Sequence, residues 1–338
     1  MHSLSNCSAL LTLQGWALYI ELCQLFKRQG ALTQCSMEDF MSINLLHSLD
    51  TENIERAKMV YLPHSNKSMK KALDNGWTVT NTTAAHIANN IEKLNAQLEQ
   101  GLIVKKATIK SNAKLDGIPA ISFPNIFVQS VFMRLYYENF DRMSDIPAAK
   151  ILMDYFKAHA VCQNCGRCSG LCYNNKFEAQ YAQKAISELR MLLAYITDRT
   201  ALSEKIIRAA KRSKSGYFRI NANGEIHSEE MLCMWTYIAL KCPEIEFYTY
   251  TKSFSLFEEH LAKQDFPTNF HVNMSVIEGQ EEQLSKYTRL YSGNKFKMVT
   301  KVPENSTTTC TGNCSTCGRL CMRDLPEDNN TIYCLYHN

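Results

Sequence analysis

Nine of the fourteen cysteines in this chain fall into two groups, and this clustering constrains the fold more than any other feature of the sequence. The first group has the spacing C-x2-C-x2-C-x3-C, and the second opens with C-x3-C-x2-C. Thiolates are soft ligands that suit zinc ions and iron–sulfur clusters. The sequence therefore predicts a metal–thiolate protein. Its predicted ligands are Cys162, Cys165, Cys168 and Cys172 in the first group, and Cys310, Cys314, Cys317, Cys321 and Cys334 in the second.

The spacing of the first group favours an iron–sulfur cluster, and above all a [4Fe–4S] cluster. C-x2-C-x2-C-x3-C is the ligand run of bacterial ferredoxins, in which a tight loop wraps the cluster. A zinc site more often uses two C-x2-C pairs that are a dozen or more residues apart. Zinc held by one pair from each group therefore stays open as the alternative metal. Disulfides would need an oxidising compartment, and the chain shows no secretory signal.

The opening of the second group, Cys310-x3-Cys314-x2-Cys317, has the three-cysteine spacing of radical S-adenosylmethionine enzymes. In those enzymes the fourth iron of the cluster is left open for the cofactor. S-adenosylmethionine is therefore a candidate cofactor. In that superfamily the motif follows the first strand of a barrel, whereas here it lies close to the end of the sequence.

Charge and hydropathy narrow the choice of compartment and partner. The net charge of +4 does not require a polyanionic partner. No run of about 18 apolar residues is present, and residues 9–26 lack the basic start of a signal peptide. We therefore expect a cytoplasmic protein of a bacterial host cell with no membrane partner. Nucleic acid remains a candidate partner, because Lys205, Arg208, Lys211 and Arg212 lie partly on one face of an expected helix.

Hydrophobic periodicity predicts an α-helical N-terminal region over residues 1–100 and an α/β domain over residues 101–338. Helices are expected at residues 4–30, at 80–100, at 131–159 with a break at Pro147, at 178–197 and at 201–212. Residues 103–109 alternate between apolar and polar like a strand. Residues 216–251 read as strand, helix and strand with short connections, which is a βαβ unit with parallel strands. Further strands are expected at 270–276 and 297–302, which gives a parallel sheet or partial β/α barrel.

Three patterns occur in order along the chain: Asn112-Ala-Lys-Leu115, the cysteine loop that ends Cys172-Tyr173, and Tyr250-Thr-Lys-Ser253. Together they resemble the phage family called gene product 88, over about residues 105–325. The resemblance implies a phage or prophage origin and an α/β fold. It also implies a radical-SAM-like placing of a cysteine loop before the sheet. It implies no particular reaction.

Charged and polar residues follow the expected strands at the edge where parallel sheets bind ligands. Arg219 lies within one strand, Glu225 and Ser228 follow it, and Lys252 follows the next. These four residues are the candidate catalytic set, in which Arg219 and Lys252 hold a carboxylate or phosphate and Glu225 orients it or acts as a base. Asn112, Tyr250 and Ser253 are the candidate cofactor-binding residues. A purely structural ion network is the competing interpretation, and His227 is expected to be a surface histidine.

Two functions from different classes are consistent with the sequence. The first is an iron–sulfur enzyme with a radical-SAM-like fold, acting on a small-molecule or macromolecular substrate that the sequence does not identify. The second is a zinc-stabilised protein that binds nucleic acid or another partner.

Overall fold

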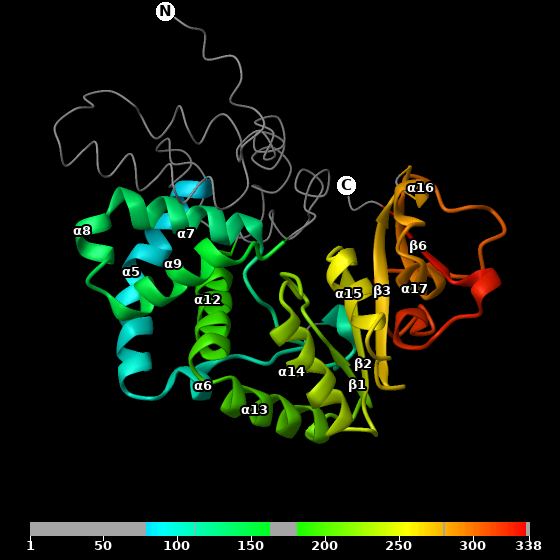
Figure 1. The fold of residues 1–338 in the computed structure, drawn as a ribbon, viewed down its shortest axis with the longest axis horizontal. Coiled ribbons are helices and arrows are strands. Elements are labelled where there is room, and N and C mark those ends of the chain that lie inside the picture. Colours follow the sequence, from blue (N-terminus) through cyan, green and yellow to red (C-terminus); the bar gives the residue numbers. More distant parts are fainter. Residues whose placement is uncertain (1–78, 112, 163–180, 280, 336–338) are drawn as a thin grey trace, which may run out of the picture.

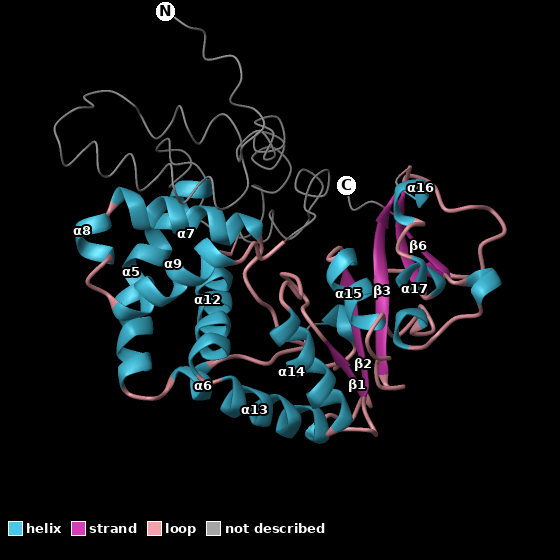
Figure 2. Ribbon diagram, in the orientation of Figure 1, coloured by secondary structure: helices cyan, strands magenta, loops and turns pink. Residues whose placement is uncertain are grey.

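The computed structural model describes residues 79–111, 113–162, 181–279 and 281–335. Helices gather in one layer, and a parallel sheet with its own covering helices stands beside them (Figure 1). Figure 2 shows that every strand lies in the sheet half. The helical layer consists of α5 (Val79–Glu99), α6 (Ile103–Lys106), α7 (Ile126–Glu138), α8 (Phe140–Met143), α9 (Pro147–Ala158), α12 (Ala182–Thr197) and α13 (Arg199–Arg212).

The sheet has six strands, all parallel, in the order β1-β2-β3-β4-β6-β5, and it is curled. The strands are β1 (Tyr217–Arg219), β2 (Glu246–Thr251), β3 (Phe270–Ile277), β4 (Asn294–Val299), β5 (Thr309–Cys310) and β6 (Thr331–Leu335). The α-helices between them are α14 (Glu229–Leu240), α15 (Phe254–Leu261), α16 (Glu281–Leu284) and α17 (Thr288–Ser292). The short 3-10 helices are η2 (Ala113–Leu115), η3 (Leu320–Met322) and η4 (Glu327–Asn329). The predicted α/β fold with a parallel sheet is confirmed.

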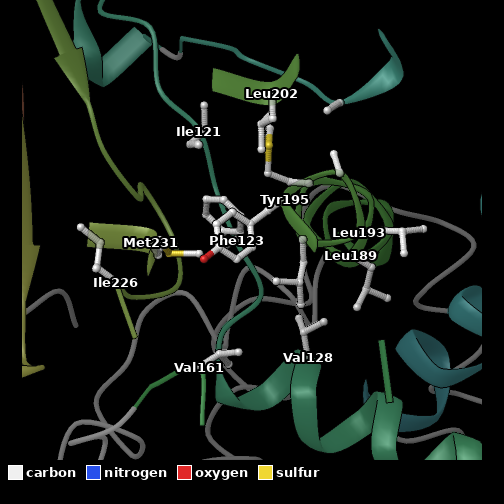
Figure 3. Packing of buried hydrophobic residues seen from close by; sticks show 14 of the residues in the cluster. Ile121, Phe123, Val128, Val161, Leu189, Leu193, Tyr195, Leu202, Ile226 and Met231 are labelled. Atoms are coloured by element: carbon white, nitrogen blue, oxygen red, sulfur yellow. The ribbon is translucent and has the colours of Figure 1, made fainter. Parts of the chain in front are cut away.

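Alternation along the strands gives the sheet two different faces, because successive side chains point to opposite sides. On the outer face, Phe218 and Phe247 pack with Trp235 of α14. This packing belongs to one large apolar core that continues into the helical layer. Figure 3 shows the junction, where Phe123 and Tyr195 of α12 meet edge to face at 6.0 Å between ring centroids. The two layers therefore share a single core.

The inner face of the sheet carries a second, smaller core. Tyr248 of β2 and Ile332 of β6 are buried there together with Leu115, Leu320 and Cys321. η3 contacts β2 and β3, so the cysteine-rich segment after β5 folds back over this face. The inner face is therefore covered by the polypeptide that carries the second cysteine group.

Most expected helices form close to their predicted bounds. Pro147 is the first residue of α9, at the predicted break. Proline is tolerated there because an N–H group in the first turn of a helix has no intrahelical partner, so its absence costs no hydrogen bond. The helix expected at residues 4–30 lies outside the described residues. No helix in the described part of the chain is both long enough and apolar enough to span a bilayer.

The expected strand at residues 103–109 is wrong, because residues 103–106 form the short helix α6. The ammonium group of Lys205 donates to the carbonyl oxygens of Val104, Lys105 and Ala107 at 2.9, 2.8 and 2.6 Å. The last carbonyls of a helix have few intrahelical partners; of these three, Val104 O also accepts from Ala107 N–H at 3.1 Å. A side chain about a hundred residues away therefore stabilises a conformation that local alternation does not indicate.

Candidate metal centre

The second cysteine group begins at one edge of the sheet. Cys310 is the last residue of β5, and Cys334 on β6 is its register partner. Cys314 and Cys317 lie in the following loop, and Cys321 lies in η3. Cys321 and Cys334 are buried, whereas the other three are partly exposed. The fold thus brings all five cysteines of this group to the same end of the molecule.

The thiols of this group touch one another in pairs. Cys310 is in hydrogen-bonding contact with Cys317 and Cys334, and Cys314 is in contact with Cys317. No three His, Cys, Asp or Glu side chains among the described residues are arranged to hold one metal ion. The sulfurs therefore form a chain of pairwise contacts instead of surrounding a common point.

Two sulfurs in this chain, those of Cys317 and Cys334, have a lowered pKa, and Cys310 donates to both. Donation from Cys310 and then from Cys314 lowers the pKa of Cys317 far below its usual range, and the backbone N–H groups of Arg319 and Leu320 add to this effect against burial. The same contacts raise the pKa values of Cys310 and Cys314, which keep their protons. The thiolate is the form that binds metals.

Two glycines shape the loop so that backbone N–H groups face sulfur. Gly312 has a φ of 77° and donates its N–H to Cys310 Sγ at 3.4 Å. Gly318 has a φ of 67°, and Arg319 after it has a φ of 55°. Positive φ is easily adopted by glycine and strained for other residues. Hydrogen bonds to sulfur of this kind tune the ligands of thiolate metal centres.

Aromatic and cationic groups of the inner face lie against the cysteines. The hydroxyl of Tyr248 lies beside Cys314, and that of Tyr250 contacts Cys321. Arg219 of β1 stacks its guanidinium over the Tyr250 ring at 5.2 Å, and its positive charge acts on Cys314 and Cys321. Two residues predicted for cofactor or substrate binding, Tyr250 and Arg219, are thus neighbours of the second cysteine group.

Two asparagines that the sequence analysis missed dock the cysteine-rich segment onto the sheet. Asn273 of β3 donates to Cys321 O at 2.8 Å and to Thr249 O at 3.1 Å. Asn294 of β4 donates to Arg323 O at 2.7 Å and accepts from the N–H of Leu325 at 3.0 Å. Both side chains are buried. For Asn273, an asparagine within the strand expected at residues 270–276 was the available signal, because a buried amide needs partners. Asn294 lies outside the strand expected at residues 297–302, so no such signal marked it.

A second set of candidate residues meets at the carboxyl ends of β1 and β2. Glu225 accepts hydrogen bonds from the N–H of Ile226 at 3.0 Å and of Lys252 at 2.7 Å. Burial raises the pKa of Glu225 to about 7, and these hydrogen bonds oppose the rise. The ammonium of Lys252 donates to Ser275 Oγ at 2.6 Å and to Ser275 O at 2.9 Å. The strand ends thus bring Glu225 and Lys252 together through the backbone.

The remaining candidates have different surroundings. Ser228 caps α14 by accepting from Met231 N–H at 3.2 Å, which is a structural role. Ser253 is fully buried, and its hydroxyl has no hydrogen-bond partner among the described residues. Cys162 is partly exposed at the end of a described segment. The other predicted residues, Asn112, Cys165, Cys168 and Cys172, lie outside the described residues.

His227 is buried, so the expectation of a surface histidine is wrong. Its Nδ1 lies 2.9 Å from Glu225 O, and its Nε2 lies 2.7 Å from the Tyr155 hydroxyl. A carbonyl oxygen only accepts, so Nδ1 carries the proton and Nε2 accepts from Tyr155. Burial lowers the pKa of His227 to about 4, which keeps the ring neutral. This contact links α9, which precedes Cys162, to the loop that carries Glu225.

Comparisons with known proteins give one clear relationship. Neither the curated proteins nor the solved structures include a match to this chain. A protein-family model described as gene product 88 matches residues 136–311, a span that includes β1 to β5 and ends one residue after Cys310. Since the match covers just over half of the 338 residues, the chain belongs to the gene product 88 family.

Proposed function

We propose that this protein is a phage or prophage metal–thiolate protein whose second cysteine group is the metal centre. The observation that carries the proposal is the contact chain among Cys334, Cys310, Cys317 and Cys314, with backbone N–H groups directed at two of the sulfurs. Thiols without a ligand role need no such donors. Arg219 supplies a positive charge beside the group, which would offset the negative charge of several thiolates.

An iron–sulfur cluster is the metal that we favour. Cys310-x3-Cys314-x2-Cys317 begins at the end of an edge strand in a curled parallel sheet, which is the kind of position that a radical-SAM-like arrangement uses. S-adenosylmethionine then remains a candidate cofactor. Glu225 and Lys252, at the strand ends, would bind substrate or cofactor, with Glu225 as an acid or base near neutral pH.

Anaerobic purification of the full chain tests the metal directly. We expect a brown protein that contains iron and sulfide in equal amounts, as a [4Fe–4S] cluster does. Cys317→Ser should reduce the iron bound by the second group, because it removes the thiolate that the other thiols and the backbone stabilise. Cys233→Ser is the matched control, since Cys233 is an exposed cysteine on α14 outside both groups.

The outcomes separate the alternatives. Equal iron content in Cys317→Ser and Cys233→Ser would remove the second group from the metal centre. A protein that binds neither iron nor zinc after anaerobic purification would contradict the whole proposal.

A zinc-stabilised interaction protein is the second candidate, and the direct thiol contacts favour it. Tetrahedral zinc with Zn–S bonds of about 2.3 Å holds its sulfurs about 3.8 Å apart, which is close to thiol–thiol contact. A colourless protein with stoichiometric zinc, which unfolds when zinc is removed, would establish this candidate. Nucleic-acid binding by α13 has less support, because Lys205 donates to three carbonyls and Arg208 pairs with Glu204 at 3.4 Å.

A further inference from the structure

A cavity of about 350 Å³ opens beside the second cysteine group. Its walls come from two separate parts of the chain, β1 and the loop around η3. The volume is at the lower end of the range for small-molecule sites. The residues that matter for its chemistry are Tyr217, Cys314, Ser315, Arg319, Met322 and Arg323.

The charged groups in these walls are both cationic. Arg319 and Arg323 line the cavity, and no carboxylate is among its lining residues. Asp116 pairs with Arg319 at 3.2 Å, so one acidic group offsets one of the two cations. The guanidinium of Arg323 has no acidic partner within the described residues. The cavity therefore presents a net positive charge to a ligand.

The position of Arg319 is fixed before any ligand arrives. Its guanidinium lies over the Tyr217 ring at 4.6 Å while it pairs with Asp116, and the backbone N–H of Arg319 is bonded to Cys317. A planar guanidinium that is held in place offers paired N–H donors, which match the oxygens of a carboxylate or phosphate. The hydroxyl of Ser315 at the same wall already donates to Asn313 Oδ1 at 2.8 Å, so the donors for a ligand come from the guanidinium groups.

We infer that this cavity binds a small oxyanionic ligand, a carboxylate or a phosphate, through Arg319 and Arg323. Cys314 forms part of the same wall. The ligand therefore sits against a sulfur of the second cysteine group. The anion site goes beyond the proposed function, because neither its charge nor its shape requires a bound metal.

Isothermal titration calorimetry on the full chain tests this inference with two probes, inorganic phosphate and succinate, which separate the two sources of oxyanion. Titration of sodium chloride at the same ionic strength corrects for general salt effects. We expect saturable binding of at least one probe. Arg323→Met should weaken it about ten- to hundredfold, as the loss of a charge-assisted hydrogen bond does, and Arg323→Lys should retain part of the affinity.

Arg212→Met is the matched control, because Arg212 is an exposed arginine at the end of α13 and outside the cavity. Absence of saturable binding of both probes would overturn the inference, and so would equal affinities of Arg323→Met and Arg212→Met. Metal content measured on the same samples distinguishes a failure of the anion site from a failure of the proposed metal centre. Specific phosphate binding by a metal-free protein would support the anion site and contradict the proposed metal centre.

Discussion

Gly224 is the residue whose identity the backbone restricts most. Its φ is 73°, in the left-handed region, and a Cβ at this position would lie 2.7 Å from Phe123 O and 2.8 Å from Pro124 O. The carbonyl of the neighbouring Asn223 accepts from Phe123 N–H at 3.0 Å. The loop after β1 therefore packs directly on the backbone of residues 123 and 124, and this packing positions Glu225.

Replacing Gly224 with alanine should destabilise the protein by about 2–4 kcal/mol. Left-handed backbone costs a non-glycine residue about 1–2 kcal/mol, and relief of the carbonyl contacts requires a backbone shift in addition. Gly279→Ala is the control, because Gly279 has a φ of 82° but open space at its Cβ position. Urea denaturation should show a clearly larger loss for Gly224→Ala. Equal losses in the two variants would mean that the close approach to Phe123 has no energetic consequence.

Glu225 should make stability fall as pH rises from about 4.5 to 7. An unfolded glutamate loses its proton near pH 4.3, whereas burial raises the pKa of Glu225 in the folded protein to about 7. Between these values the folded state holds a proton that the unfolded state has lost, so deprotonation disfavours folding. The penalty is roughly 3–4 kcal/mol, and it is fully present above pH 7.

Glu225→Gln should remove this part of the pH dependence. The variant should also have a lower free energy of unfolding at every pH. Its side-chain NH2 group would face a backbone N–H that donates to the carboxylate in the wild type. Free energies of unfolding measured at several pH values between 4.5 and 7.5 check the slope. The same slope in the wild type and in Glu225→Gln would contradict the buried carboxyl as its source.

At the scale of elements, the segment that carries the second cysteine group is attached to the sheet by side chains of β3 and β4. Asn273 and Asn294 bind backbone groups of Cys321, Arg323 and Leu325. His271 of β3 adds hydrogen bonds to Glu246 at 2.7 Å and to Asp324 at 3.0 Å. Regular strands therefore position an irregular segment, as is common at functional sites.

Asn273→Ala should loosen this segment and cost about 1–3 kcal/mol, because the buried carbonyl of Cys321 loses its donor. A metal held by the second group should then be lost faster to a chelator. Asn90→Ala is the control, since the Asn90 side chain donates to His86 O at 2.8 Å within α5 and lies far along the chain from the second cysteine group. Chelator rates that are the same for both variants would show that the Asn273 contacts do not hold the metal site.

The βαβ unit of β1, α14 and β2 could be predicted from sequence because its signals are local. Ser228 caps the helix, and alternation marks β2. Other features depend on distant contacts. β4 begins three residues earlier than expected, at Asn294, and β5 and β6 were not expected at all. The strand order places β6 between β4 and β5, which no local pattern encodes.

The candidate site also combines features that local sequence patterns predict with features that depend on distant contacts. Cysteine spacing indicated which residues are the candidate ligands of the second group. It could not indicate that Arg219 lies next to these cysteines, because that contact joins residues about a hundred positions apart. The sequence predicts a surface position for His227 for the same reason, since its partner Tyr155 belongs to a different layer.

At the scale of the whole molecule, polar contacts as well as the shared core join the helical layer to the sheet. Asn223, in the loop after β1, donates to Glu188 of α12 at 2.8 Å. His227, in the same loop, accepts from Tyr155 of α9. The loop that carries Glu225 is therefore held from both layers, so a change in the position of either layer would reach this carboxyl.

An open sheet must also avoid pairing with other chains. A row of unpaired N–H and C=O groups on an outermost strand invites intermolecular strand addition, and short outermost strands are a common protection against it. Here the outermost strands are β1 with three residues and β5 with two. Arg219 of β1 also bridges to Ala120. The sheet thus offers little template for aggregation at either side, and the long strands β2 and β3 stay enclosed between neighbours.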